Sequence, residues 1–254
     1  MPSSLSGPIA AAVAATVLLF VSAPARADEG PVDLLLVLAA DVSRSVNDEK
    51  FKLQREGYAA AIVDPRVVRA MTGGAHGRIA LIFVEWASEF EQRVIIDWTV
   101  IAGEADAQAV SRRMSTADRS YRGRTSISAA IDFSMTLLAQ SPFQANRQVI
   151  DISGDGTNNS GRDVTAARDE ALSKGVTING LVILSDVPLA TNPAHTHPPG
   201  GLTAYYENNV IGGPGAFVLE AAGFEAFGQL IISKLVKEIA GLASPPMMSG
   251  HTLR

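Results

Sequence analysis

Residues 32–45 read VDLLLVLAADVSRS, and this stretch decides the fold. The eight residues Asp33 to Ala40 are almost wholly apolar and rich in Leu and Val, which is typical of a strand buried on both faces of a parallel sheet. The apolar run stops at Ala40, a turn begins at Asp41, and a helical pattern begins near Asn47. Open α/β sheets bind their ligands at the carboxyl ends of strands, so a site is expected on the turn that starts at Asp41.

That turn carries the spacing D-x-S-x-S, formed by Asp41, Ser43 and Ser45. Alternate residues of a turn can point to one side, so one carboxylate and two hydroxyls can converge. Mg²⁺ prefers oxygen ligands of this kind in near-octahedral geometry. The turn alone does not establish a metal site, because Ser45 or Asn47 is equally suited to cap the helix that follows.

Strands and helices alternate along the rest of the chain. Strands are expected at residues 33–40, 78–85, 92–98, 148–153, 176–184 and 216–220, and helices at 47–68, 105–115, 127–140, 161–174 and 224–240. The short connection between the second and third strands favours an antiparallel hairpin. The pattern predicts a doubly wound α/β fold, with a mostly parallel six-stranded sheet, one antiparallel edge strand and helices on both faces. Residues 185–215 are rich in Pro and Gly and are expected to be a long irregular connection.

The two ends of the chain differ from this pattern. Residues 9–23 form an apolar run of 15 residues, which is shorter than the roughly 20 that a membrane span needs. Ala25-x-Ala27 follows it, so we expect a signal peptide at 1–27 that is cleaved before Asp28, with an uncleaved anchor as the alternative. The expected domain is 28–241 and the tail 242–254 is expected to be disordered. The mature protein would then be periplasmic or secreted, without a stable membrane span.

Charge and cysteine content exclude several functions. The net charge is −5, and removing residues 1–27 takes away one Arg (Arg26) and no acid, which leaves −6. A mildly acidic domain is a poor candidate for nucleic-acid binding. The chain has no cysteine, which rules out thiol catalysis and cysteine-based metal sites.

Two further loops are expected at the same edge of the sheet as Asp41. They contribute Thr125, just before a helix, and Asp155, in an Asp-Gly turn after a strand. With these loops the sequence resembles the von Willebrand factor A-like domain with its metal-ion-dependent adhesion site, and within that class a family of predicted exported bacterial proteins. The resemblance covers residues 31–240 and rests on LAADVSRSV (38–46), RGRTSIS (122–128), IDISGDGTNNSGRD (150–163) and VIGGPGAFV (210–218).

The resemblance implies a metal site and a way of using it. It implies that Mg²⁺ or Mn²⁺ is held directly or through water by five residues: Asp41, Ser43, Ser45, Thr125 and Asp155. It also implies that a carboxylate of a protein partner fills the open coordination position. In one respect the sequence departs from the pattern, because Gly154 stands where a Ser or Thr usually precedes the aspartate, so no hydroxyl is available there.

The sequence gives weaker support for a role of other polar residues near these loops in binding a partner or a metal. Arg44, Arg122 and Arg124 could draw an acidic partner toward the cation, although solvated arginines on an acidic protein are an equal alternative. His195 and His197 have no carboxylate nearby in the sequence, so we predict no second metal site from them. The oligomeric state is left open.

We expect a binding module rather than an enzyme. No Gly-x-Ser-x-Gly elbow is present, and none of the histidines lies in the predicted metal loops. The alternative enzyme is a metal-dependent phosphatase similar to the haloacid dehalogenases, because GDGTNN (154–159) resembles their acidic loop. Their general acid would stand at Ser43, which cannot take that role, and Asn159 replaces their last Asp. A third reading is a scaffold of the same fold that binds no metal.

Overall fold

The structure of the chain is a computed structural model that describes residues 30–241. The expected signal peptide (1–27) and the expected tail (242–254) lie outside the described residues. None of the helices between residues 30 and 241 is long and apolar enough to cross a membrane.

A single six-stranded sheet forms the centre of the described part, in the order β3-β2-β1-β4-β5-β6. The strands are β1 (Leu35–Asp41), β2 (Ile79–Trp86), β3 (Gln92–Ile101), β4 (Gln148–Gly154), β5 (Thr177–Ile183) and β6 (Val218–Ala221). All neighbouring strands are parallel except β2 and β3, which form an antiparallel hairpin with β3 at the edge. The predicted fold class is therefore confirmed.

Strand β1 divides the interior into two cores because its side chains alternate between the two faces of the sheet. Leu36 and Leu38 belong to one core, whereas Leu35 and Val37 belong to the other. Every residue of β1 is buried. This two-sided burial explains why the strand is an unbroken apolar run rather than an alternating one.

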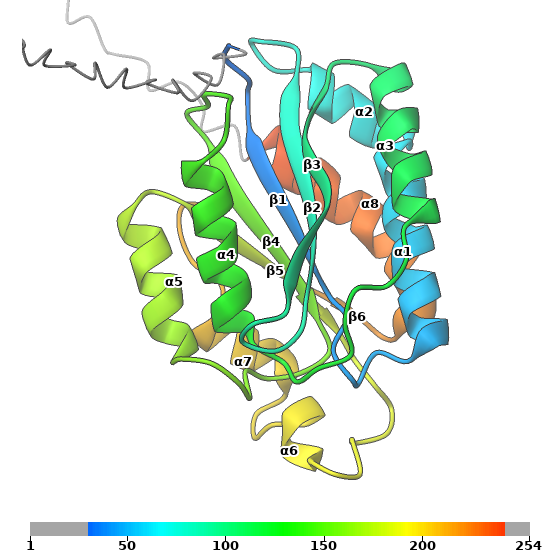
Figure 1. Cartoon of the computed structure of the whole chain (residues 1–254), viewed down its shortest axis with the longest axis vertical. Coiled ribbons are helices and arrows are strands. Elements are labelled where there is room, and N and C mark those ends of the chain that lie inside the picture. Colours follow the sequence, from blue (N-terminus) through cyan, green and yellow to red (C-terminus); the bar gives the residue numbers. More distant parts are fainter. Residues whose placement is uncertain (1–29, 242–254) are drawn as a thin grey trace, which may run out of the picture.

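Helices cover both faces of the sheet (Figure 1). On one face lie α1 (Asp48–Ile62), α2 (Pro65–Thr72), α3 (Glu104–Thr116) and α8 (Phe224–Ala240). On the other lie α4 (Ile127–Ala139), α5 (Val164–Ser173) and α7 (Leu202–Asn209). The short helix α6 (Pro193–Thr196) lies at the lower end of Figure 1.

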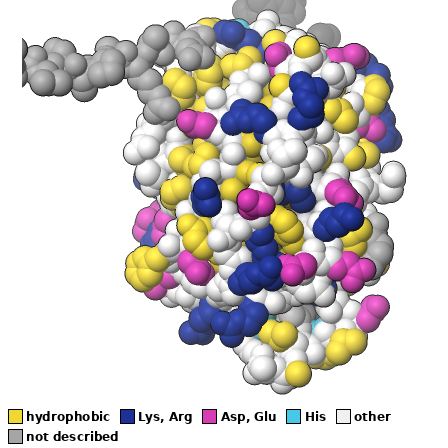
Figure 2. All heavy atoms as spheres, turned by 45° about the vertical axis from the view of Figure 1, so that its right-hand side comes forward, with side chains coloured by type: hydrophobic (Ala, Val, Ile, Leu, Met, Phe, Trp, Pro, Cys, Tyr) yellow, Lys and Arg dark blue, Asp and Glu magenta, His cyan; other side chains and the backbone are white. Residues whose placement is uncertain are grey.

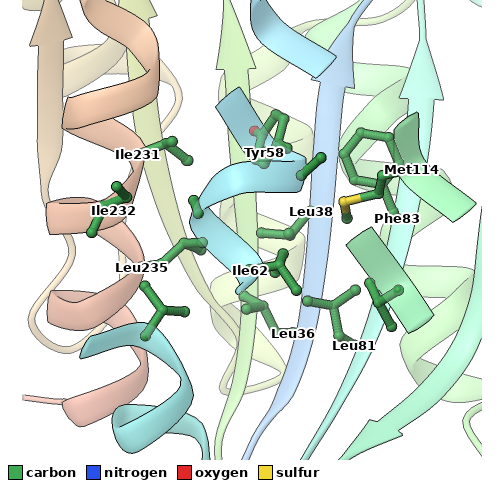
Figure 3. Close-up of a cluster of buried hydrophobic side chains, with 14 of the residues drawn as sticks. Leu36, Leu38, Tyr58, Ile62, Leu81, Phe83, Met114, Ile231, Ile232 and Leu235 are labelled. Atoms are coloured by element: carbon green, nitrogen blue, oxygen red, sulfur yellow. The ribbon is translucent and has the colours of Figure 1, made fainter. Parts of the chain in front are cut away.

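The core on the α1 side is centred on Tyr58. Its ring packs edge-on against Phe83 of β2 and Phe227 of α8, with ring centroids 5.2 and 5.1 Å apart. Figure 3 shows α1 and α8 side by side over the sheet, with Leu38 of β1 beneath α1 and Ile231 of α8 facing it. Helices α1 and α8 therefore share one core on this face of the sheet.

The structure corrects two expectations about the helices. The single helix expected at 47–68 is two helices, because the chain turns at Asp64, whose side chain accepts a hydrogen bond from the Arg66 N–H while Pro65 opens α2. Proline is favoured at the first position of a helix and cannot continue one. The connection 185–215 is also less irregular than expected, since it contains α6 and α7.

A cluster of buried charges attaches α8 to the sheet. The ammonium of Lys234 lies 2.5 Å from a carboxylate oxygen of Asp151 on β4 and 2.5 Å from one of Glu238, one helical turn further along α8. None of the three residues is more than 2% exposed. Burial, followed by the charge of Asp151, raises the pKa of Glu238 to about 7.

Candidate metal site

The sheet topology brings the three predicted loops together. Strands β1 and β4 are parallel neighbours, and the chain order reverses between them, so the space beyond their carboxyl ends is the switch point where such sheets bind ligands. Asp41 is the last residue of β1, and Asp155 directly follows β4. Thr125 lies two residues before α4, whose N-cap is Ser126.

A continuous series of hydrogen bonds joins four of the five predicted site residues. The Ser43 N–H donates to Asp41 Oδ1 at 2.7 Å, and the hydroxyls of Ser43 and Ser45 are 3.1 Å apart. The Ser45 hydroxyl then donates to Asp155 Oδ1 at 2.5 Å. The first and third loops are thus in direct contact through side-chain oxygens.

Thr125 is held against the third loop rather than bonded to the other four residues. Its N–H donates to Asn159 Oδ1 at 3.0 Å, and its carbonyl accepts the Asn159 N–H at 2.8 Å. Its buried hydroxyl lies 3.2 Å from Nε2 of His195. The structure therefore places all five residues at the same edge of the sheet.

The two carboxylates of the site are incompletely satisfied. Asp41 and Asp155 are each no more than 1% exposed, and Oδ2 of both is buried without a hydrogen bond. The ammonium of Lys50 lies 3.6 Å from Asp155 Oδ2. Burial, followed by the charge of Asp155, raises the pKa of Asp41 to about 7, and burial likewise raises the pKa of Asp155. The arrangement is a pair of buried acids with too little positive charge beside them.

Such a pair suits a divalent cation with oxygen ligands. Between residues 30 and 241, no three or more His, Cys, Asp or Glu side chains are grouped so that they could hold a metal. A cation here would therefore depend on hydroxyl ligands beside the two carboxylates. The loops carry such hydroxyls at the predicted positions Ser43, Ser45 and Thr125.

His195 is a site residue that the sequence reasoning missed. It lies on α6, is 2% exposed, and its carbonyl accepts the Thr157 N–H at 2.9 Å. Burial lowers the pKa of its imidazole. Its ring covers Gly156 so closely that a Cβ there would lie 2.1 Å from the ring. No spacing in the sequence indicated this contact, because it depends on how the connection 185–215 folds.

The structure also explains the glycine that departs from the family pattern. A Cβ on Gly154 would lie 2.6 Å from the hydroxyl oxygen of Tyr206 on α7 and 3.2 Å from Asp41 Oδ2. A Ser or Thr at this position would displace the Tyr206 ring, which is fully buried. The missing hydroxyl is thus a consequence of the way α7 packs under the site.

The three arginines predicted near the site, Arg44, Arg122 and Arg124, differ in the contacts that their side chains make. Arg122 Nη2 contacts Asp48 Oδ1 at 2.5 Å, and Arg124 Nη2 donates to the Asn159 carbonyl at 2.5 Å. Arg44 is exposed, and its side chain forms no hydrogen bond or ion pair with the residues that the structure describes. Figure 2 shows Lys and Arg side chains at the lower end of the molecule, with acidic side chains beside them.

Comparison with known proteins gives the family. The chain belongs to the family described as "Protein of unknown function (DUF1194)", which matches residues 31–243. A comparison with curated protein sequences gave no match.

Solved structures with the same fold include adhesive proteins. Proximal thread matrix protein 1 from the mussel byssus, with a zinc-occupied MIDAS motif, is 14% identical, with a TM-score of 0.54 over 85% of this chain and 47% of its own. The pilus adhesin SpaC from Lactobacillus rhamnosus GG is 12% identical, with a TM-score of 0.56 over 82% of this chain and 30% of its own. BatB from Bacteroides thetaiotaomicron, a conserved hypothetical protein, is 15% identical, with a TM-score of 0.51 over 82% of this chain and 98% of its own.

At these identities the comparison establishes the fold alone, which is that of the von Willebrand factor A-like domain. This chain spans less than half the length of the mussel protein and of the adhesin.

Proposed function

We propose that this chain is an exported binding module that engages a carboxylate of a protein partner through a bound divalent cation. Mg²⁺ or Mn²⁺ would be held by the carboxylates of Asp41 and Asp155 and by the hydroxyls of Ser43, Ser45 and Thr125. The cation supplies a positive charge with an open coordination position. The mussel protein, which has a zinc-occupied MIDAS motif, and the pilus adhesin are of the same fold, which favours this kind of function.

The observation that carries the proposal is the pair of buried oxygens, Asp41 Oδ2 and Asp155 Oδ2, that accept no hydrogen bond. Leaving a buried charged acceptor unsatisfied costs about 1–3 kcal/mol or more. Proteins keep such an arrangement where a ligand offsets that cost. A divalent cation would neutralise both carboxylates at once and would lower the pKa of Asp41 from about 7.

Charge also favours an acidic partner. With both aspartates ionised, a divalent cation makes the site neutral, and Lys50 beside it adds one positive charge. Arg44 is exposed on the same loop as the two serines. A carboxylate entering the coordination shell would therefore meet a positive surface on a protein whose net charge is negative, which supports binding to an acidic group.

We further propose that the chain has no hydrolase activity of its own. A phosphatase of the haloacid dehalogenase type would need acidic groups from the third loop. The side chains of Asn158 and Asn159 serve the backbone instead, since their Oδ1 atoms accept the N–H groups of Ser128 and Thr125. Turnover of a generic phosphate ester that requires Mg²⁺ and is abolished by Asp41→Asn would overturn this proposal.

Metal titration tests the proposed site. Mg²⁺ and Mn²⁺ are added to metal-free protein while heat of binding and melting temperature are recorded. At a hundredfold excess over Kd, binding stabilises the fold by about 2.7 kcal/mol. Asp41→Ala should abolish the effect, while Asp118→Ala, which removes an exposed carboxylate, should retain it. Equal binding by both variants would place the cation elsewhere and refute the proposal.

The partner is sought in an envelope extract, because the proposed location is the periplasm or the exterior. Immobilised protein should capture a partner in Mg²⁺ and release it in EDTA, and the Asp41→Ala variant should capture nothing. N-terminal sequencing of the exported fraction tests the location. A chain recovered from the cytoplasm with Met1 intact would contradict export.

A further inference from the structure

His195 is surrounded by hydrogen-bonding groups on both sides of its ring. Its Nε2 lies 3.2 Å from the hydroxyl oxygen of Thr125. Its Nδ1 lies 3.2 Å from the Thr157 hydroxyl oxygen and 3.2 Å from Nδ2 of Asn159. A neutral imidazole has one nitrogen that donates and one that accepts, so these neighbours determine which nitrogen carries the proton.

Asn159 decides the tautomer. Its Oδ1 accepts the backbone N–H of Thr125 at 3.0 Å, so the atom that faces His195 must be the amide nitrogen, which only donates. A flipped amide would bring two donors, the Thr125 N–H and the NH₂ group, against each other. Nδ1 of His195 is therefore the acceptor, and the proton of the ring is on Nε2.

The Nε2 proton points to Thr125. A threonine hydroxyl has two lone pairs and one hydrogen. When the His195 N–H occupies one lone pair, the other lone pair remains for a cation. The hydroxyl hydrogen is then left to be donated to an oxygen that accepts it.

We infer that His195 is a positioning residue of the proposed metal site, and that its Nε2–H orients the Thr125 hydroxyl toward the cation and a partner carboxylate. This inference rests on the proposed function and adds a residue to it. The hydroxyl can then contribute a lone pair to the metal and a hydrogen bond to the incoming anion. His195 itself does not coordinate the metal, because a free lone pair on Nε2 would put a proton on Nδ1, facing the Asn159 amide nitrogen.

The fold holds the ring in this place. The carbonyl of His195 accepts the Thr157 N–H, and the ring lies on Gly156 within the space that any side chain there would need. Helix α6 therefore rests on the third loop and directs the His195 ring donor at the Thr125 hydroxyl, on the second loop. The connection 185–215 becomes a functional part of the site.

Two substitutions separate donation from mere packing. His195→Gln keeps an N–H donor near the position of Nε2, whereas His195→Met fills similar space without a donor. By calorimetry, the Met variant should bind Mg²⁺ or Mn²⁺ about 10- to 100-fold more weakly than wild type, as when the partner of a metal ligand is lost. The Gln variant should stay within about threefold of wild type, since it restores the donor.

A double-mutant cycle tests whether the effect passes through Thr125. In a Thr125→Val background, which removes the hydroxyl at nearly constant shape, His195→Met should cause no further loss of affinity. A full additional loss would mean that His195 acts elsewhere. Selective loss of Zn²⁺ affinity in both His195 variants, with Mg²⁺ binding unchanged, would make His195 a direct ligand and overturn the inference.

Nitrogen-15 NMR of the histidine rings tests the tautomer without any metal. The chain has four histidines, and the His195→Gln spectrum identifies the signals of His195. Metal-free wild type should show the Nε2-protonated form, and an Nδ1-protonated ring would refute the inference even if the Met variant failed to fold. If wild type binds no cation, the proposed function fails instead, and the two failures are thus distinguishable.

Discussion

Replacing Asp41 by Asn should stabilise the metal-free protein while abolishing metal binding. Asp41 is fully buried, and its pKa is raised from 3.8 to about 7, first by burial and then by the charge of Asp155. Asn keeps an oxygen to accept the Ser43 N–H, which Asp41 Oδ1 accepts at 2.7 Å. The substitution therefore removes an unfavourable charge and little else.

The sign of the pH effect follows from the raised pKa. Because folded Asp41 holds its proton more tightly than unfolded Asp41, folding stability falls as the pH rises from about 4 to about 7 and is level above that. A shift of about three pKa units corresponds to at most about 4 kcal/mol. In EDTA at pH 8 the Asn variant should be more stable than wild type by up to this amount, and the two should converge near pH 4.

Denaturant unfolding in EDTA at pH 4, 6 and 8 measures the difference. The raised pKa of Asp41 should also make Mg²⁺ binding by wild type about 100-fold weaker at pH 5 than above pH 7. The reason is that the proton on Asp41, with a pKa of about 7, competes with the cation. If the Asn variant is less stable than wild type at pH 8 in EDTA, the charge of Asp41 is already compensated without metal, and the reasoning is wrong.

Three further predictions concern the surroundings of the site. Lys50→Met should strengthen Mg²⁺ binding, because the ammonium 3.6 Å from the Asp155 carboxylate competes with the cation. The exposed Lys52→Met variant should bind like wild type, and equal calorimetric affinities of the two variants would contradict the prediction. Gly156→Ala should lower the free energy of unfolding by about 1–3 kcal/mol through overlap with the imidazole ring. Gly228→Ala, inside α8, should cause no comparable loss, because the nearest atom to a Cβ there is 3.8 Å away. Glu238→Gln should reduce the loss of stability between about pH 4.5 and pH 7, since the folded pKa of this buried acid is raised to about 7; an unchanged pH profile would refute it.

The main elements, and the position of the five proposed ligands at one edge of the sheet, could be predicted because local patterns determine them. A run of apolar residues that ends in Asp41 marks a buried strand and its carboxyl end, and parallel strands bring such ends to one edge. The break between α1 and α2 also had a local signal, the pair Asp64-Pro65. It was missed because the apolar spacing continues across it.

His195 and Tyr206 could not be predicted in the same way. They lie 40 and 51 residues after Asp155, in a connection without helical or strand periodicity. Their positions depend on how α6 and α7 pack against the loops, which is a tertiary property. Gly154 and Gly156 are the corresponding local signs, since their missing side chains leave room for these two rings.

The buried charges of α8 fix its axial register on the sheet. Lys234 and Glu238 are one turn apart, and a turn advances a helix by about 5.4 Å. Translation by one turn in one direction would set Glu238 against Asp151, carboxylate against carboxylate. The opposite translation would withdraw Lys234 and leave Asp151 without a cation, and breaking a buried pair in this way costs about 3–5 kcal/mol.

These ion pairs therefore hold α8 in a single axial position, although its first residue, Phe224, lies close to the proposed metal site. The Lys50 ammonium is 5.1 Å from the centre of the Phe224 ring. If a cation bound at the proposed site and displaced this ammonium, the flexible lysine chain would absorb the movement while α8 kept its register. Any signal that travels along α8 would first have to neutralise or re-pair Lys234.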